Sequence, residues 1–115
     1  SLGTFFCSKY LGQTSEIVYL MLLNNKMQMI DCVKMHEGSV NSVGLSIRKI
    51  VETALTKNAA SVVLAHNHPG GRPFPSTDDL NTTRLVRDAL SNVGVDMVAH
   101  ILVAENKYID ILENS

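Results

Sequence analysis

Two histidines and an aspartate in one short stretch of the sequence have the residue types and spacing of a metal site. His66 and His68 follow the apolar run of residues 61–65, whose length and β-branched content predict a buried strand. On an extended chain, side chains two residues apart point to the same side, with Cα atoms about 6.5 Å apart at ~3.3 Å per residue. Asp79 lies on the first turn of the next predicted helix, so its carboxylate can swing back toward the strand end. Catalytic zinc sites commonly use three N or O ligands, and His66, His68 and Asp79 would supply such a set for one Zn²⁺ per chain.

The same residues also have an ordinary structural interpretation. A His-x-His pair occurs by chance in many proteins. Ser76, followed three residues later by Asp79, is the pattern of a helix start, with a serine N-cap and an acidic residue near the positive end of the helix dipole. Taken alone, capping explains this pair better than metal binding does. The two roles are compatible, because a capping serine can still face a ligand pocket.

The complete pattern, His-x-His, seven residues and Ser-x-x-Asp, resembles the signature of the JAMM (MPN+, JAB) metalloprotease-like domain. The letters A-H-N-H-P-G-G-R-P-F-P-S of residues 65–76 are similar to the A-H-N-H-P-S-G-x-P-x-P-S stretch of the bacterial RadC branch. Gly70 and Arg72 depart from that stretch, and neither is expected to be a ligand. The resemblance extends from about residue 16 to residue 108, nearly the whole chain.

The resemblance implies a zinc-dependent hydrolase. Zinc, the usual metal of JAMM domains, lowers the pKa of its bound water toward about 7, which supplies a nucleophile at neutral pH. Ser76, beside the metal, would donate a hydrogen bond to the oxyanion as water attacks a carbonyl. The expected reaction is hydrolysis of an amide or isopeptide bond, and the expected partner is a peptide or isopeptide-like substrate.

Two glutamates compete for the role of acid/base. Glu16 stands at the first position of a predicted apolar strand, eight residues before Asn24, and this spacing is similar to that of RadC-like sequences. In JAMM domains the glutamate at the entrance of this strand handles the water, so the resemblance favours Glu16. Glu37 is the rival, within residues 34–42, a segment that resembles the family's G-T-L-N-S stretch. If the resemblance is set aside, a carboxylate at the start of a buried strand is expected to lie at the edge of the sheet, in water.

Two other functions compare less well with the sequence. One is a non-catalytic RadC-like domain that binds a metal or a partner in a DNA-repair-associated role. The intact set of His66, His68, Ser76 and Asp79 favours chemistry, because a degraded homologue commonly loses its ligands first. The other is a zinc deaminase, whose H-x-E and P-C-x-x-C signatures do not occur in the sequence.

Composition describes an ordinary globular chain. The 115 residues are 45% hydrophobic and 18% charged, which suits one domain, and the net charge of −1 gives no pull toward nucleic acid or a membrane. Cys7 and Cys32 lie far apart and no apolar run reaches the ~20 residues of a membrane span, so a cytoplasmic location is expected. We expect residues 1–115 to be a single RadC-like JAB/MPN domain, excised from a longer protein with an N-terminal helical region.

Hydrophobic periodicity predicts the elements that must position the site. Leu2, Phe5 and Phe6 are expected on the inner face of the first helix, Leu55 on that of the second and Val93 on that of the third. The fold class predicted is α/β, a single mixed, largely antiparallel sheet flanked by two or three helices, the JAB/MPN and cytidine-deaminase-like architecture. Helices are predicted at residues 2–11, 46–58 and 77–93, and strands at residues 16–23, 27–33, 61–65, 95–103 and 107–112, with Asn24 and Asn25 supplying positive φ in the first hairpin.

Two histidines outside the motif receive structural roles. His100 falls where RadC-like chains have D-H-I-I-I, although Ala99 here replaces the aspartate. A lone histidine in a strand is more often a core or edge residue than a ligand. If His100 borders the pocket, it would hydrogen-bond the substrate or orient a ligand. His36 is expected to be structural.

Overall fold

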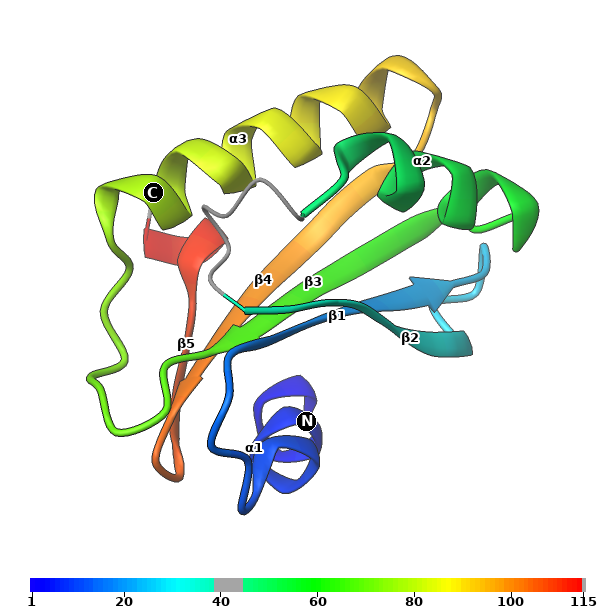
Figure 1. Cartoon of the computed structure of the whole chain (residues 1–115). Helices are drawn as coiled ribbons and strands as arrows, with labels where there is room; N and C mark the ends of the chain where they lie inside the picture. Colours follow the sequence, from blue (N-terminus) through cyan, green and yellow to red (C-terminus); the bar gives the residue numbers. More distant parts are fainter. Residues whose placement is uncertain (39–44, 115) are drawn as a thin grey trace.

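The computed structural model describes residues 1–38 and 45–114, which form a mixed five-stranded sheet with helices on both faces (Figure 1). The sheet order is β2-β1-β3-β4-β5, with β3 and β4 parallel and the other neighbours antiparallel. The predicted α/β fold is confirmed. The elements are α1 (Leu2–Tyr10), β1 (Ile17–Leu23), β2 (Met29–Glu37), α2 (Ile47–Thr56), β3 (Ser61–Asn67), α3 (Thr77–Asn92), β4 (Asp96–Ala104), β5 (Lys107–Asp110) and a 3₁₀ turn, η1 (Ile111–Asn114).

The sheet separates two apolar cores. Figure 1 shows α2 and α3 over one face and α1 against the other. Alternate residues of β1 and β3 enter each core, which is why both strands are almost continuously apolar. The core under α2 and α3 contains Leu20, Leu22, Ile50, Leu64, Val86 and Leu90, and the core under α1 contains Phe6, Tyr10, Met21, Val63 and Ile101.

The hairpin between β1 and β2 differs from the prediction. Asn24 Oδ1 accepts hydrogen bonds from the backbone N–H groups of Lys26, at 2.9 Å, and Gln28, at 3.0 Å. The asparagine therefore acts through its side chain, and the positive φ of 61° falls on Met27. As a result β2 begins at Met29 and continues to Glu37. Residues 39–42, part of the segment that resembles G-T-L-N-S, lie outside the described residues.

Three apolar side chains predicted to face the core are exposed instead. Phe5 is 36% exposed, Leu55 51% and Val93 41%. In α1 the inner face carries Gly3, Phe6 and Tyr10, so Phe5 lies beside that face. Leu55 stands in the last turn of α2 and Val93 is the C-cap of α3, so both lie at helix ends.

The N-terminal helix docks closely on the last strand. A Cβ atom on Gly3 would lie 2.0 Å from the ring of Tyr108, so only glycine permits this approach. None of the helices formed by the described residues is long and apolar enough to span a membrane.

Candidate metal centre

The site forms where β3 leaves the sheet and α3 begins. His66 lies in β3 opposite Leu102 of β4 and is fully buried. The N–H of His68 still donates to the carbonyl of Val103 at 2.8 Å, so pairing with β4 continues one residue beyond the strand. Both imidazoles therefore project from a backbone that the parallel pairing with β4 holds in place.

A tight turn fixes the ring of His68. The N–H of Gly71 donates to the His68 carbonyl at 3.0 Å, and Gly70 adopts a φ of 68° that suits glycine. The loop then returns so that His68 Nδ1 lies 3.1 Å from the carbonyl oxygen of Arg72. Because a carbonyl only accepts, Nδ1 carries the proton and Nε2 is the atom left to face Asp79 Oδ2, at 3.0 Å.

The first turn of α3 directs Asp79 toward both histidines. Ser76 is the N-cap, and its Oγ accepts the N–H of Asp79 at 3.0 Å, while the Ser76 N–H donates to Asp79 Oδ2 at 2.8 Å. This is the capping box predicted from the sequence. The reciprocal bonds turn a buried carboxylate back over the end of β3, where Oδ1 lies 3.3 Å from His66 Nε2.

A chain of buried hydrogen bonds sets the protons of His66. The Thr83 hydroxyl donates to the Asp79 carbonyl at 2.7 Å, so its oxygen must accept from His100 Nδ1 at 2.6 Å. Burial lowers the pKa of His100 well below its ordinary value, so this ring is neutral and its Nε2 accepts. The partner at 2.7 Å is His66 Nδ1, to which we therefore assign the proton.

The assigned tautomers leave lone pairs converging on one point. Among buried side-chain atoms of the described residues, His66 Nε2 has no hydrogen-bond partner. It faces a carboxylate oxygen at 3.3 Å, and two acceptors repel unless a proton or a metal cation lies between them. Atoms bound about 2.0–2.1 Å from a tetrahedral zinc ion lie roughly 3.4 Å apart. The ligand atoms of His66, His68 and Asp79 all lie within 4.8 Å of one another, so the three residues could hold a metal ion.

The pKa shifts of His68 and Asp79 fit this arrangement. The hydrogen bond to Asp79 raises the pKa of His68 and outweighs partial burial, and Glu16 adds to the effect. Burial acts to raise the pKa of Asp79, but contacts with both histidines and the Ser76 N–H hold it well below its usual range. Asp79 is therefore a carboxylate at neutral pH, as a metal ligand must be.

Glu16 stands one residue before β1. Its carbonyl accepts the N–H of Gly38 at 2.8 Å, and its charge acts on His68. The side chain of Asn67 binds the residues on both sides of Glu16, since its Oδ1 accepts from Ile17 N at 2.7 Å and its Nδ2 donates to the Ser15 carbonyl at 3.0 Å.

The rival glutamate is engaged elsewhere. Glu37 lies on β2, opposite Ile17 and on the far side of β1 from β3. Its carboxylate bonds to Lys34 Nζ at 2.5 Å, and this contact lowers its pKa. His36 also belongs to β2, opposite Val18. Of the two glutamates, Glu16 is the one whose charge acts on His68.

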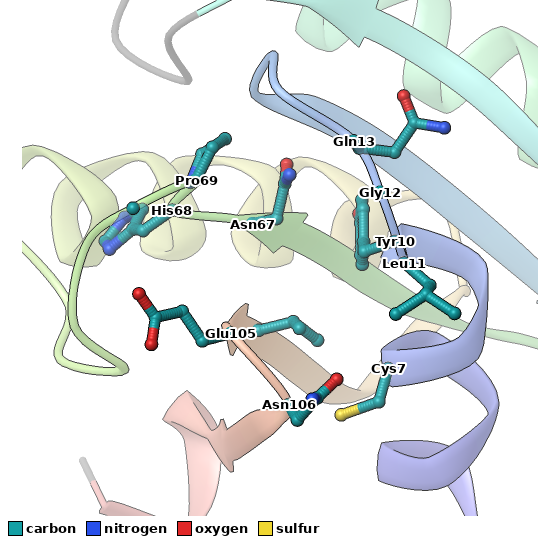
Figure 2. A pocket seen from close by; sticks show the side chains of 12 residues that line it. Cys7, Tyr10, Leu11, Gly12, Gln13, Asn67, His68, Pro69, Glu105 and Asn106 are labelled. Carbon is teal, nitrogen blue, oxygen red and sulfur yellow. The ribbon is translucent and has the colours of Figure 1, made fainter.

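A pocket of about 140 Å³ opens beside His68, between the end of α1 and the β4–β5 turn (Figure 2). Tyr10 and Val103 contribute apolar wall, and Glu105 and Asn67 contribute polar groups. Of the three candidate metal ligands, His68 lines this pocket.

The sequence does not predict the roles of Asn67 and Thr83, two neighbours of the candidate ligands, and it gives that of His100 only as the less favoured alternative. Asn67 stands within the motif, but its partners are about 50 residues away. Thr83 lies four residues after Asp79, and this helical spacing signals a shared face. His100 orients a ligand, the less favoured of its two predicted roles.

Comparisons with known proteins agree with the geometry. The family model described as "RadC-like JAB domain" matches residues 1–115. A protein of Stenotrophomonas maltophilia, named UPF0758 protein, is 34% identical over 113 residues, which cover 98% of this chain and 48% of the relative. Another UPF0758 protein, from Clostridium beijerinckii, is 34% identical over 98 residues, or 85% of this chain and 43% of the relative.

A third UPF0758 protein, from Clostridium botulinum, is 36% identical over 105 residues and extends the same comparison, with 91% of this chain and 45% of the relative covered. The chain thus spans a little under half the length of these relatives. Since the family model covers the chain from end to end, this protein belongs to the RadC-like JAB domain family.

Proposed function

We propose that this domain is a zinc-dependent hydrolase of the JAMM type. The observation that carries the proposal is His66 Nε2, a buried atom that has no hydrogen-bond partner among the described residues and that faces a carboxylate. A site that held only water or apolar groups would not require a nitrogen lone pair and a carboxylate oxygen 3.3 Å apart. Two imidazoles and one carboxylate are a donor set that suits zinc and leaves room for substrate.

The chain's own groups supply the acid, the base and the hydrogen-bond donor. When bound, zinc would act as a Lewis acid and lower the pKa of water toward about 7. Glu16 takes a proton from the attacking water and passes it to the leaving amine. Ser76 uses its oxygen to cap α3, so its hydroxyl proton is available to the oxyanion.

The substrate class follows from this set of groups. A carboxylate base from the segment before β1 and a hydroxyl donor at the N-cap of α3 suit attack on a carbonyl with an amine leaving group. We therefore propose a peptide or isopeptide bond as the substrate. The pocket beside His68 would take the group next to the bond that is cleaved.

The test measures metal binding and cleavage separately. Metal-free protein is titrated with zinc, and the loaded protein is incubated with a peptide library that is read by mass spectrometry. We expect one equivalent of zinc, and Glu16→Gln is expected to keep the zinc while cleavage falls about 10²–10⁴-fold, as for loss of a general base. Glu52→Gln, on α2, is the matched control and is expected to change neither.

Each other result has a defined meaning. Protein that takes up no zinc removes the enzyme proposal. Unchanged cleavage in Glu16→Gln transfers the acid/base role to Glu37 or another group. Zinc uptake with no cleavage of any peptide favours a non-catalytic metal-binding domain with a DNA-repair-associated role.

A further inference from the structure

The β1–β3 ladder ends before it reaches the metal-binding group. The last backbone pair is Tyr19 with Ala65. In the same register Ile17 would stand opposite Asn67, and Glu16 opposite His68. The strands do not pair there, although β3 still pairs with β4 through Asn67 and Val103. The two strands thus separate where Glu16 must approach the histidines.

The side chain of Asn67 fills the gap that this separation creates. Asn67 is 4% exposed, and its Oδ1 and Nδ2 take the places of a backbone acceptor and donor toward β1. Paired strands lie about 4.7–4.9 Å apart, and an inserted side chain holds them farther apart. A carboxamide suits this role because one end donates and the other accepts. Figure 2 shows Asn67 between His68 and the segment that leads from α1 to β1.

These contacts fix the backbone of Glu16 from two directions. Asn67 binds Ser15 O and Ile17 N, the main-chain groups that flank Glu16. Gly38 binds the carbonyl of Glu16 itself, from the side of β2. The Cα position of Glu16 is therefore set relative to β3, and the carboxylate keeps only its side-chain rotations.

We propose that Asn67 is a positioning residue, which places the Glu16 carboxylate relative to His66 and His68. The inference rests on the proposed function for the role of Glu16 in proton transfer. The placement itself rests on geometry, namely the hydrogen bonds of Asn67 to Ile17 and Ser15 together with the bond from Gly38 to the Glu16 carbonyl. Asn67 sets the width of the gap between β1 and β3, and this width sets the distance over which Glu16 reaches the reacting water.

The experiment compares Asn67→Ala with Asn24→Ala in the full chain. Asn24 is the matched control because its side chain also holds backbone N–H groups, in a hairpin at the opposite end of β1. Crystal structures of both metal-free variants test the placement. We expect Glu16 to move away from His68 in Asn67→Ala, with the ligands in place, and to stay in place in Asn24→Ala. Asn67→Asp, which keeps the acceptor for Ile17 and loses the donor to Ser15, covers a failure of Asn67→Ala to fold.

A second readout uses cobalt(II) as the probe. Its visible spectrum is titrated with pH in the wild type, Glu16→Gln, Asn67→Ala and the double variant. We expect Asn67→Ala to keep cobalt affinity within about threefold and to shift the titration midpoint in the same direction as Glu16→Gln. The double variant is expected to add little to Glu16→Gln, because the two residues act as one unit. For any peptide that the wild type cleaves, we expect a loss of about 100-fold in Asn67→Ala, as for misplacement of a catalytic group.

The outcomes separate this inference from the proposed function. Glu16 unmoved in Asn67→Ala, or additive shifts in the double variant, would overturn the role of Asn67. A wild type that binds no cobalt overturns the proposed function, and the crystal structures then still decide whether Asn67 places Glu16.

Discussion

The two histidines of the metal-binding group are held by different means. His66 is fully buried, and its Nδ1 is held by His100 of β4, whose other ring nitrogen bonds to Thr83 of α3. His68 has a side chain 19% exposed, and its Nδ1 is held by the carbonyl of Arg72 in the loop before α3. The inner wall, formed by His66, His100 and Thr83, thus depends on the identity of side chains that are distant in sequence. The outer loop, residues 68–72, depends only on the path of the main chain.

This difference predicts where substitutions should matter. Any residue in the outer loop supplies a carbonyl, so side-chain changes there should be tolerated if the turn is kept. In the inner wall, each hydrogen bond decides which nitrogen of the next ring carries the proton. A single loss there propagates to the lone pair of His66.

Asp79 contacts both histidines, so its substitution should have the largest effect on zinc affinity. Asp79→Asn removes the negative charge and directs an amide toward two histidine nitrogens. We expect zinc affinity to fall more than about 100-fold, beyond the 10–100-fold typical for the outer partners of metal ligands. Titration against a competing chelator measures it. Asp78→Asn, an exposed neighbour on the same turn, is the control, and equal losses in both variants would contradict the assignment.

Breaking the inner wall should cost less, but clearly more than changing the outer loop. His100→Ala removes the acceptor of His66 Nδ1–H and leaves Thr83 without its donor. We expect zinc affinity to fall about 10–100-fold and the free energy of unfolding to fall by about 1–3 kcal/mol. Arg72→Ala keeps its carbonyl and should change affinity by less than about threefold. Calorimetric titration and urea unfolding measure both, and a larger effect at Arg72 would reverse the comparison.

Thr83→Val tests the origin of the chain of hydrogen bonds. Valine keeps the shape of threonine, but it gives His100 Nδ1 no acceptor. His100 can then carry its proton on Nε2, which opposes the proton on His66. We expect a loss of roughly tenfold in zinc affinity. ¹⁵N NMR of the imidazoles should show the changed tautomer of His100, and unchanged spectra would refute the assignment.

Zinc affinity should depend on pH through His68, in the outer loop. The pKa of His68 is raised, so in metal-free protein this ring binds a proton below that raised pKa. Zinc must displace the proton, and apparent affinity should rise with pH through the range above about 6.5 and then level off. The same shift stabilises the metal-free fold fully below about pH 6.5, and this contribution is lost as pH rises through the raised pKa. Calorimetry in buffers of different ionisation enthalpy counts the protons, and His68→Gln should release fewer.

A substitution far from both histidines should leave zinc affinity unchanged. Gly3→Ala places a Cβ against the Tyr108 ring and should lower the free energy of unfolding by about 1–3 kcal/mol. Zinc affinity per folded molecule should stay within experimental error. A marked loss of affinity would mean that α1 supports the site.

Local patterns were enough to predict most elements and three residues that the fold brings together as candidate ligands, but not the groups that orient those residues. His66, His68, Asp79 and the capping Ser76 lie within 14 residues, and their spacing follows from strand and helix geometry. His100 meets His66 only because β4 pairs with β3 in a register that aligns Leu64 with His100. Periodicity within one segment carries no information on that register, nor on the approach of β1 to Asn67. The hairpin differs from its prediction for a related reason, because the Asn24 side chain bonds to the turn backbone and the positive φ falls on Met27.

The Thr83 hydroxyl has a further consequence, because it donates to the main-chain carbonyl of Asp79. Asp79 would therefore offer its carboxylate to a bound ion and, through its peptide carbonyl, govern the proton on His66. This chain of hydrogen bonds is complete only after the first turns of α3 have formed and packed on β4. During synthesis the histidines emerge earlier, with neither ring committed to a protonation pattern. We expect selective capture of the ion to begin when that helix is complete.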